Sequence, residues 1–382
     1  MGGGGGRVAE TAKARARRAT LLRDEDYRRL LEQPTVGDIA VELKKTSYAS
    51  VLKNFSLETM HRAELEFLLD AAILEEGLAF RHYMGPDDRK LLNLWLENFD
   101  IELFKNHFRL QMKTGELEHA DITRLFDLAD FHLTLVDREK LFAGAAWRDI
   151  LGSVKKESLR AALMEIIPEG YDMSGTEDGA AFQKMAFAMG MTLDRYYFDS
   201  LSTAAGAMGG SEGGMMKMLV GTRVDLMNLY WIYRGRRFFN MLPEEALTLV
   251  TKVRYHVDFQ MLTRAAFADP AAFSSVLRDT PCGRVFDVEE KDAALRELQV
   301  EKNIYRALSM AVDRVFMSGS QGFQNIAAYL MLKEFEIRDL IAVIEAVRYG
   351  FDRGVTERAL IRRLSDDVAH GTKSAINTKS GG

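Results

Sequence analysis

The chain has 382 residues, of which 47% are hydrophobic and 28% are charged, and its formal net charge at pH 7 is −5. This composition is typical of a soluble protein with a real core, and the small net charge excludes bulk affinity for nucleic acid. The single cysteine, Cys282, excludes an internal disulfide framework, and no apolar run reaches the ~18 residues of a membrane-spanning helix.

The chain begins with a glycine run and then a basic stretch. We expect residues 1–6 and residues 376–382 to be flexible ends, and residues 7–33 to form an amphipathic N-terminal helix. Its basic side chains include Arg15, Arg17 and Arg18, and leucines supply an apolar stripe. Two interpretations are open: the stripe packs on the body with the arginines in solvent, or the arginines contact an acidic protein surface or lipid headgroups.

Proline and apolar spacing together indicate the fold class. Only six prolines occur, and none follows Pro281. Proline usually interrupts helices, and the apolar residues of the last hundred positions recur at helical spacing, as in Ile337, Leu340 and Ile344. Alternation typical of strands is scarce. We therefore predict an all-α protein, and a chain of this length is expected to contain more than one structural unit.

A short acid-bearing pattern recurs along the chain. Its copies are "FDIELFKNHFR" (99–109), "VDLMNLYWIYR" (224–234) and "FEIRDLIAVIE" (335–345). Each copy has an acid after its first apolar residue, and these acids are Asp100, Asp225 and Glu336. Asn228 in the second copy is matched by Asp339 in the third but by Leu103 in the first. An acid recurring in an otherwise apolar helix is costly to bury without a partner.

A glycine-containing break precedes each copy, and another helical stretch precedes each break. The breaks are "MGPDD" (84–88), "GAMGGSEGG" (206–214) and "SGSQG" (318–322). The recurring unit is therefore a helix, a glycine turn and a helix bearing an acid. We predict three helical repeats over residues 34–145, 146–268 and 269–375.

Three roles are open for the recurring acids. They are solvated residues on helix surfaces, or half-buried acceptors for backbone N–H groups or arginines that fix how the units dock, or catalytic or metal-binding groups. The third role has the weakest support, because no histidine or second acid accompanies all three copies.

A search for chemistry finds no recognisable motif. The glycines at 206–214 lack the Gly-Lys-Ser/Thr of a phosphate loop, and the histidines never fall at metal-ligand spacing, including the two in the acid-rich segment 116–132. Asp-Asp pairs at 87–88 and 366–367 do not fit the D-D-x-x-D spacing of prenyl-transfer enzymes. We expect no catalytic, cofactor or metal site. The nearby Met215, Met216 and Met218 either fill the core or contact a partner, and the core is the simpler interpretation.

The order and number of these motifs, with "TSYASVL" (46–52) and the "VRYG" that ends the third copy, resemble the C-subunit family of rotary V/A-type ATPases. The eukaryotic member of that family is called the d subunit. The resemblance runs from about Ala12 to Asp352, and Leu103 departs from it where the family commonly has asparagine. It implies three similar helical bundles around a pseudo-threefold axis, shaped as a funnel or socket.

The resemblance also implies a function. Family members are non-catalytic rotor adaptors, present in a single copy, that sit on the cytoplasmic face of the membrane proteolipid c-ring and receive the D and F subunits of the central stalk. They transmit torque between ATP turnover and proton or sodium transport without a cofactor of their own. Two alternatives are open: a helical-repeat scaffold of an unrelated pathway, and a lipid-modifying or prenyl-type enzyme whose site the motifs do not reveal.

Overall fold

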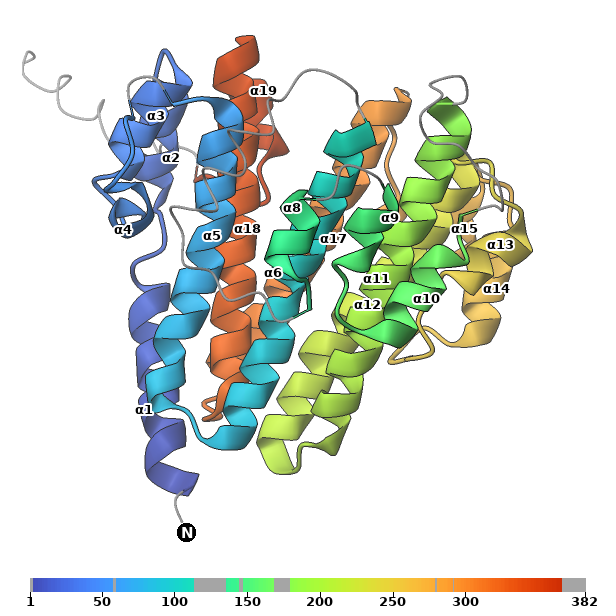
Figure 1. The fold of residues 1–382 in the computed structure, drawn as a ribbon, viewed down its shortest axis with the longest axis horizontal. Coiled ribbons are helices and arrows are strands. Elements are labelled where there is room, and N and C mark those ends of the chain that lie inside the picture. Colours follow the sequence, from blue (N-terminus) through green and yellow to red (C-terminus); the bar gives the residue numbers. More distant parts are fainter. Residues whose placement is uncertain are drawn as a thin grey trace, which may run out of the picture.

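The fold is all-helical, as predicted. The computed structural model describes residues 3–57, 60–112, 135–143, 147–167, 179–278, 280–290 and 292–365. Within these residues the only β-type pairing is an isolated bridge between Val136 and Val154. Six long helices dominate (Figure 1): α5 (Arg62–Phe80), α6 (Pro86–Met112), α11 (Gly179–Ala207), α12 (Gly210–Phe238), α17 (Ala293–Met317) and α18 (Phe323–Tyr349).

Thirteen shorter helical segments surround the long helices in the described ranges. At the N-terminus these are α1 (Gly3–Arg18), α2 (Asp24–Leu31), α3 (Val36–Leu43) and α4 (Ala49–Leu52), and a 3₁₀ turn η1 (Arg81–Tyr83) links α5 to α6. The others are α8 (Arg138–Ala143), α9 (Trp147–Gly152), α10 (Glu157–Met164), α13 (Pro243–Thr248), α14 (Phe259–Phe267), α15 (Phe273–Val276), α16 (Gly283–Phe286) and α19 (Arg353–Ala359).

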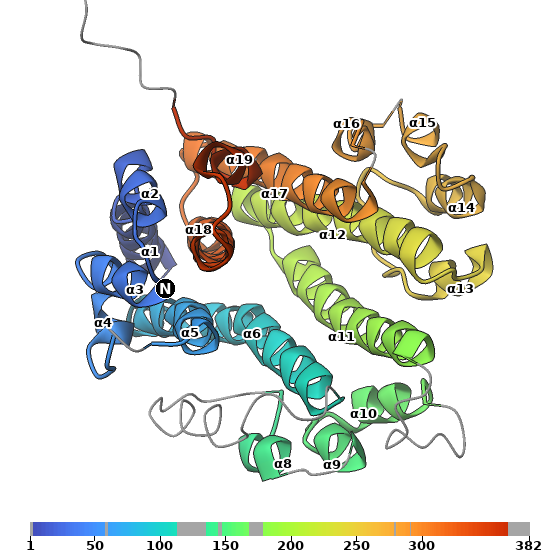
Figure 2. The ribbon, with the colours of Figure 1, turned by 90° about the horizontal axis from the view of Figure 1, so that it is seen from above.

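The long helices contact one another in a cyclic order. α5 and α6 form an antiparallel pair, α6 packs against α11, α11 against α12, α12 against α17, α17 against α18, and α18 returns to α5. Figure 2 shows this closed course from above. Three helix pairs therefore follow one another around the molecule, and the predicted pseudo-threefold rotation between them stays a prediction.

The three turns within the helix pairs lie at one end of the molecule, the lower end in Figure 1. We call this the glycine-turn end. The second and third turns touch, since the hydroxyls of Ser211 and Ser320 are 3.1 Å apart. At the start of α18, the Phe323 N–H donates to Glu212 Oε1 at 2.7 Å. A Cβ on Gly322, whose φ is 134°, would lie 2.2 Å from the same oxygen, so only glycine fits there.

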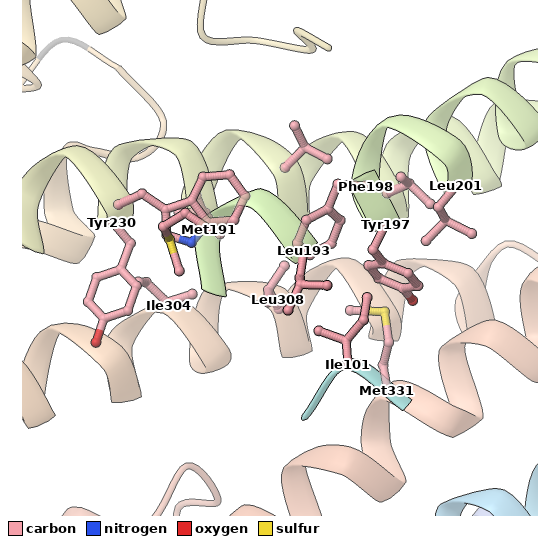
Figure 3. Packing of buried hydrophobic residues seen from close by; sticks show 14 of the residues in the cluster. Ile101, Met191, Leu193, Tyr197, Phe198, Leu201, Tyr230, Ile304, Leu308 and Met331 are labelled. Atoms are coloured by element: carbon pink, nitrogen blue, oxygen red, sulfur yellow. The ribbon is translucent and has the colours of Figure 1, made fainter. Parts of the chain in front are cut away.

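Two apolar clusters hold the helices together. The larger one includes residues from all six long helices. Figure 3 shows Ile101 of α6, Tyr197 of α11 and Met331 of α18 near one another, with Leu193, Ile304 and Leu308 in the same cluster. We call these residues the apolar layer. Apolar groups from different helices are buried against one another here, and this burial is the main force that joins the pairs.

The second cluster joins the two ends of the chain. It combines residues of α2, α3, α4 and α5 with the C-terminal half of α18. Its members include Tyr27, Ile39, Leu43, Leu65, Ile337, Leu340, Val343 and Ile344. α1 also packs along α18. The N-terminal segment is therefore part of the same body as the last long helix, although the predicted repeat boundaries separate them.

The N-terminal prediction needs correction in two places. The expected single helix over 7–33 is two helices, because α1 ends at Arg18 and α2 begins at Asp24. The backbone N–H of Leu22 donates to Glu336 instead of continuing a helical ladder. Gly3–Gly6 continue α1 where a flexible end was expected, and Arg7 in the next turn pairs with Glu212 at 2.9 Å. Residues 376–382 lie outside the described residues.

Candidate functional site

Asp225 is a buried acceptor in the middle of α12. Its carboxylate accepts three successive backbone N–H groups, from Tyr255 (3.2 Å), His256 (2.6 Å) and Val257 (3.1 Å). Burial raises the pKa of Asp225, and the three N–H donors act against that rise. Gly221, one turn earlier, lets the loop approach, since a Cβ there would lie 2.6 Å from the ring of Tyr255. The acid therefore fixes the loop that leads into α14.

Asn228 and Asp339 also accept backbone N–H groups. They lie about one helical turn after Asp225 and Glu336, respectively. Asn228 Oδ1 accepts the Thr251 N–H at 2.9 Å. Asp339 accepts the N–H groups of Ile361 (2.6 Å) and Arg362 (3.0 Å). Burial raises the pKa of Asp339 to about 7 and outweighs the two N–H groups. Both side chains hold loops that follow the long helix.

Glu336 of α18 differs from Asp225 in its partners. One carboxylate oxygen accepts the N–H of Leu22, and the other accepts the Tyr48 hydroxyl at 2.8 Å and lies 2.9 Å from Lys333 Nζ. The Lys333 ammonium also lies 3.5 Å from the centre of the Tyr48 ring, a cation–π contact. The Lys333–Glu336 pair is almost fully dry, with side chains 1% and 5% exposed. It joins α18 to the segment between α1 and α2.

Asp100 of α6 completes the set. Its side chain is 2% exposed, and Oδ2 accepts the N–H of Leu135 at 2.7 Å. Asp100, Asp225 and Glu336 are therefore all buried, and each accepts at least one backbone N–H from a segment next to a short helix. Their assignment as surface residues is excluded by this burial, and their role in docking whole units stays a prediction.

A second arrangement of charged residues lies between the long helices. Every long helix contributes to it, and we call it the charged belt: Asp70 (α5), Glu102 and Lys105 (α6), Asp194 (α11), Arg223 (α12), Glu301 (α17), Glu334 and Arg338 (α18). On α6, α17 and α18 the belt lies farther from the glycine-turn end than the apolar layer, because Lys105, Glu301 and Glu334 are three or four positions from Ile101, Ile304 and Met331 in that direction.

The inner half of the belt is dry and internally paired. Lys105 contacts both Asp194 and, at 3.0 Å, Glu102. Arg223 makes two parallel bonds of 2.9 Å to Glu334, the bidentate geometry that strengthens such pairs. Burial opposes the charge of Lys105, but Asp194 and Glu102 outweigh it and raise the pKa of the ammonium. These pairs link α6 to α11 and α12 to α18, across the boundaries between helix pairs.

The outer half of the belt is in contact with solvent. The side chains of Glu102, Glu301 and Arg338 are 42%, 35% and 35% exposed, against 8–13% for Lys105, Asp194, Arg223 and Glu334. Arg338 lies 3.5 Å from both Glu301 and Glu334. Asp70 is half-buried beside them, and burial raises its pKa to about 7 against the attraction of Arg338. Water therefore reaches charged groups between the helices.

Sequence reasoning did not identify the charged belt. The signal was present: an acid or base stands three or four positions from a core residue on each long helix, as Lys105 does beside Ile101 and Asp194 beside Tyr197. Each such charge alone is indistinguishable from an ordinary solvated helix face, so only the packing of the helices brings them together.

The basic residues of α1 contact the body of the protein. Arg15 donates to the carbonyl of Phe316 at 3.0 Å, Arg17 pairs with Glu76 at 3.0 Å and Arg18 with Asp313 at 3.1 Å. These contacts hold α1 against α5 and α17. The methionines of α12 divide, since Met216 is fully buried in the core while Met215 and Met218 are half-buried and pack against it.

The described residues were also searched for a reactive thiol, a metal site and a membrane-spanning helix. Burial raises the pKa of the Cys282 thiol to about 12, with a contribution from Asp225, so the reactive thiolate is disfavoured. The described residues contain no cluster of three potential metal-ligating side chains. None of the described helices is both long and apolar enough to cross a bilayer. The segments 116–132 and 366–370 lie outside the described residues.

Comparison with known proteins agrees with the resemblance drawn from the motifs. The family described as "ATP synthase (C/AC39) subunit" matches residues 11–358. The C subunit of the A-type ATP synthase of Thermococcus kodakarensis is 20% identical over 347 residues, covering 89% of this chain and 86% of that protein. The corresponding C subunit of the A-type ATP synthase of Pyrococcus horikoshii is 23% identical over 369 residues, covering 94% and 90%. The all-helical body and a family match over nearly its whole length lead to one conclusion: the chain belongs to the ATP synthase (C/AC39) subunit family.

Proposed function

We propose that this chain is the non-catalytic rotor adaptor of an A/V-type ATP synthase. It joins the membrane proteolipid c-ring to the D and F subunits of the central stalk on the cytoplasmic face, in a single copy and peripheral to the membrane. It transmits torque between ATP turnover and proton or sodium transport. The observation that carries the proposal is the family match over residues 11–358.

The cyclic contact of the long helices supports this role. A part that passes torque has to resist shear between its helices, and directional contacts resist shear better than apolar burial alone. The bidentate Arg223–Glu334 pair and the Lys105–Asp194 pair cross the boundaries between helix pairs. These contacts are dry, so solvent and salt weaken them little. The body is therefore suited to rotate as one piece.

The recurring acids supply a second set of rigid links. Asp100, Asp225 and Glu336, with Asn228 and Asp339, fasten the short helices to the long ones at backbone N–H groups. Backbone donors cannot change rotamer, so a carboxylate that binds them holds a loop more firmly than a side-chain pair does. In this proposal these five residues are structural, and the chain has no catalytic group of its own.

Affinity purification from native membranes tests the function. A tagged chain replaces the chromosomal copy, and mild detergent extracts the complexes. We expect the proteolipid and the ATPase head subunits to co-purify with it. Recovery of soluble partners alone would contradict the proposal and favour a helical-repeat scaffold, and turnover by the isolated chain would favour an enzyme.

A further inference from the structure

We infer that Glu10 of α1 is a proton-binding site: its side chain is held as a neutral carboxylic acid whose O–H group donates to a buried acceptor oxygen at the glycine-turn end. Loss of this proton detaches the N-terminal half of α1 from α18. The inference does not depend on the proposed function. It is carried by the burial of Glu10 and by neighbouring buried oxygens that have no donor.

Glu10 lies where α1 meets the turns that join the long helices. The N-terminal half of α1 is at the glycine-turn end (Figure 1), and α1 packs along α18. The residue after Glu10, Thr11, accepts the N–H of Gly322 at 3.0 Å through its hydroxyl oxygen. Glu10 is 1% exposed, and it is close enough to Asp88 and Glu212 for their charges to shift its ionisation. This buried carboxyl group is therefore near residues of all three turns.

Acceptor oxygens without a donor are buried in this region. Within the described residues, Glu10 Oε2, Gln324 Oε1 and Asn325 Oδ1 have no hydrogen-bond partner, and these three residues are at most 1% exposed. Both amides are neutral and are oriented by their nitrogens, since Gln324 Nε2 donates to Ser320 Oγ at 3.0 Å and Asn325 Nδ2 donates to the Ser320 carbonyl at 2.8 Å. Buried acceptors usually have a donor, so the unpaired oxygens indicate a missing hydrogen.

The cation that attracts Glu10 is already engaged. Arg7 lies one turn before Glu10, but its guanidinium pairs with Glu212 at 2.9 Å and its side chain is 56% exposed. The Glu212 carboxylate is in turn close to the unpaired amide oxygen of Gln324, because a Cβ on Gly322 would lie 2.2 Å from Glu212 Oε1 and 3.0 Å from Gln324 Oε1. An ionised Glu10 would therefore add a further negative acceptor to a region that already lacks donors.

Protonation of Glu10 supplies what this region lacks. An ionised carboxylate can only accept hydrogen bonds, whereas the acid form carries one O–H donor. Protonation also removes a charge that is costly to bury. Burial and the carboxylates of Asp88 and Glu212 raise the pKa of Glu10 to about 7, and Arg7 offsets this rise only in part. Near neutral pH, small changes of pH therefore alter the fraction of the chain in which Glu10 is protonated.

The two halves of α1 are expected to respond differently to pH. The C-terminal half is held by Arg15, Arg17 and Arg18, whose guanidinium groups stay charged. The N-terminal half depends on Glu10, whose pKa in the folded chain is raised from 4.5 to about 7. Its docking is therefore strongest below about pH 4.5 and weakens as the pH rises through about 7. A short helix that loses its packing is marginal in water, so the undocked turns should fray.

Amide hydrogen exchange of the full-length chain, read by mass spectrometry, tests the inference. Protection of the N-terminal half of α1 is measured at about pH 6 and about pH 8.5 and is corrected for the intrinsic exchange rate at each pH. We expect wild type to lose at least about tenfold in corrected protection at the higher pH. Glu10→Gln is neutral and carries N–H donors, so it should stay protected at both. The control Asp87→Asn removes a 95% exposed carboxylate beside Asp88 and should behave like wild type.

Three results would overturn the inference. Equal corrected protection of wild type at the two pH values would mean that Glu10 does not gain or lose a proton between them. The same pH dependence in Glu10→Gln would assign the effect to another group. Protection that is independent of pH but is lost when a chelator removes metal ions would mean that a cation, not a proton, satisfies the oxygens. Glu10→Met, which also cannot titrate, supplies the comparison if Glu10→Gln does not fold.

Discussion

Asp225 and Glu336 occupy the same place in two copies of one pattern, and they are satisfied in different ways. Asp225 binds three N–H groups of a loop about 30 residues later in the chain. Glu336 binds an N–H group 314 residues earlier, together with the Tyr48 hydroxyl and the Lys333 ammonium. The same device therefore closes a local loop in one copy of the pattern and joins the two ends of the chain in the other.

The difference shows what the recurring acid contributes. In both places it accepts a hydrogen bond from at least one buried backbone donor, Val257 or Leu22, that would otherwise lack a partner, so the position along the helix is kept. What varies is the origin of the donor, because the N-terminal segment takes the place beside α18 that a following loop takes beside α12. Lys333 adds an ion pair to Glu336. The equivalent position in the second copy is the uncharged Thr222, so Asp225 has no such pair.

The largest effect is expected for Glu336→Ala, which tests the acid that joins the two ends of the chain. The substitution leaves Lys333 as a buried ammonium, 1% exposed, without its carboxylate. Removal of one partner from a buried ion pair costs about 3–5 kcal/mol, and we expect that loss in the free energy of unfolding by urea. The double variant Lys333→Met/Glu336→Gln should recover much of it. A loss below about 1 kcal/mol would show that the pair contributes little.

Asp225→Ala tests the acid that closes a local loop. Three backbone N–H groups lose their acceptor, and two of them belong to exposed residues, Tyr255 and His256, that water can reach after the change. We expect a loss of about 2–3 kcal/mol in unfolding free energy, smaller than for Glu336→Ala. Asp225→Asn keeps one acceptor oxygen and should lose less. If Asp225→Ala were as stable as wild type, the loop from Tyr255 to Val257 would not depend on the acid.

Asp70→Asn examines an acid that lacks the donors of Asp225. The pKa of Asp70 is raised by burial from 3.8 to about 7, so the folded state keeps this proton to higher pH than the unfolded state does. Stability from this group is therefore greatest below about pH 4 and declines as the pH rises to about 7. Because the side chain is partly exposed, we expect Asp70→Asn to gain only about 1 kcal/mol at pH 8 relative to pH 5. Urea unfolding at the two pH values measures this, and an equal effect at both would contradict the shift.

The smallest effect is expected for Arg18→Ala. Arg18 pairs with Asp313, but the two side chains are 41% and 51% exposed, so water screens the pair. The guanidinium also lies 4.3 Å from the centre of the Phe316 ring. We expect a loss below about 1 kcal/mol in unfolding free energy. A larger loss would mean that α1 is held to the body mainly by this residue, and the two ends of the chain would then depend on more than Glu336.

Sequence reasoning reached the helical fold, the family and the recurring acids, because each has a local signal. Helical spacing and rare proline indicate the fold, and an acid at one place in an apolar helix stands out against its neighbours, as Asp225 does between Val224 and Leu226. The glycine breaks also marked the turns, although α11 and α12 are separated only by Met208 and Gly209.

What the sequence did not yield depends on contacts between distant segments. Nothing near Leu22 indicates that its N–H binds Glu336, and the break between α1 and α2 was missed for that reason. The charged belt was missed because Lys105, Asp194 and Arg338 are each ordinary on a helix surface. Their meaning comes from the cyclic order of the helices, which fixes which faces meet.

The bond between Leu22 and Glu336 has a consequence for biosynthesis. The N-terminal segment leaves the ribosome first, yet α18 emerges only after 314 further residues. At about 5–20 residues per second, this takes roughly 15–60 s, during which the apolar residues of α2 and α3 can pack with α5 but lack their contacts to α18. The N-terminal helices therefore complete their packing only after α18 has been synthesised.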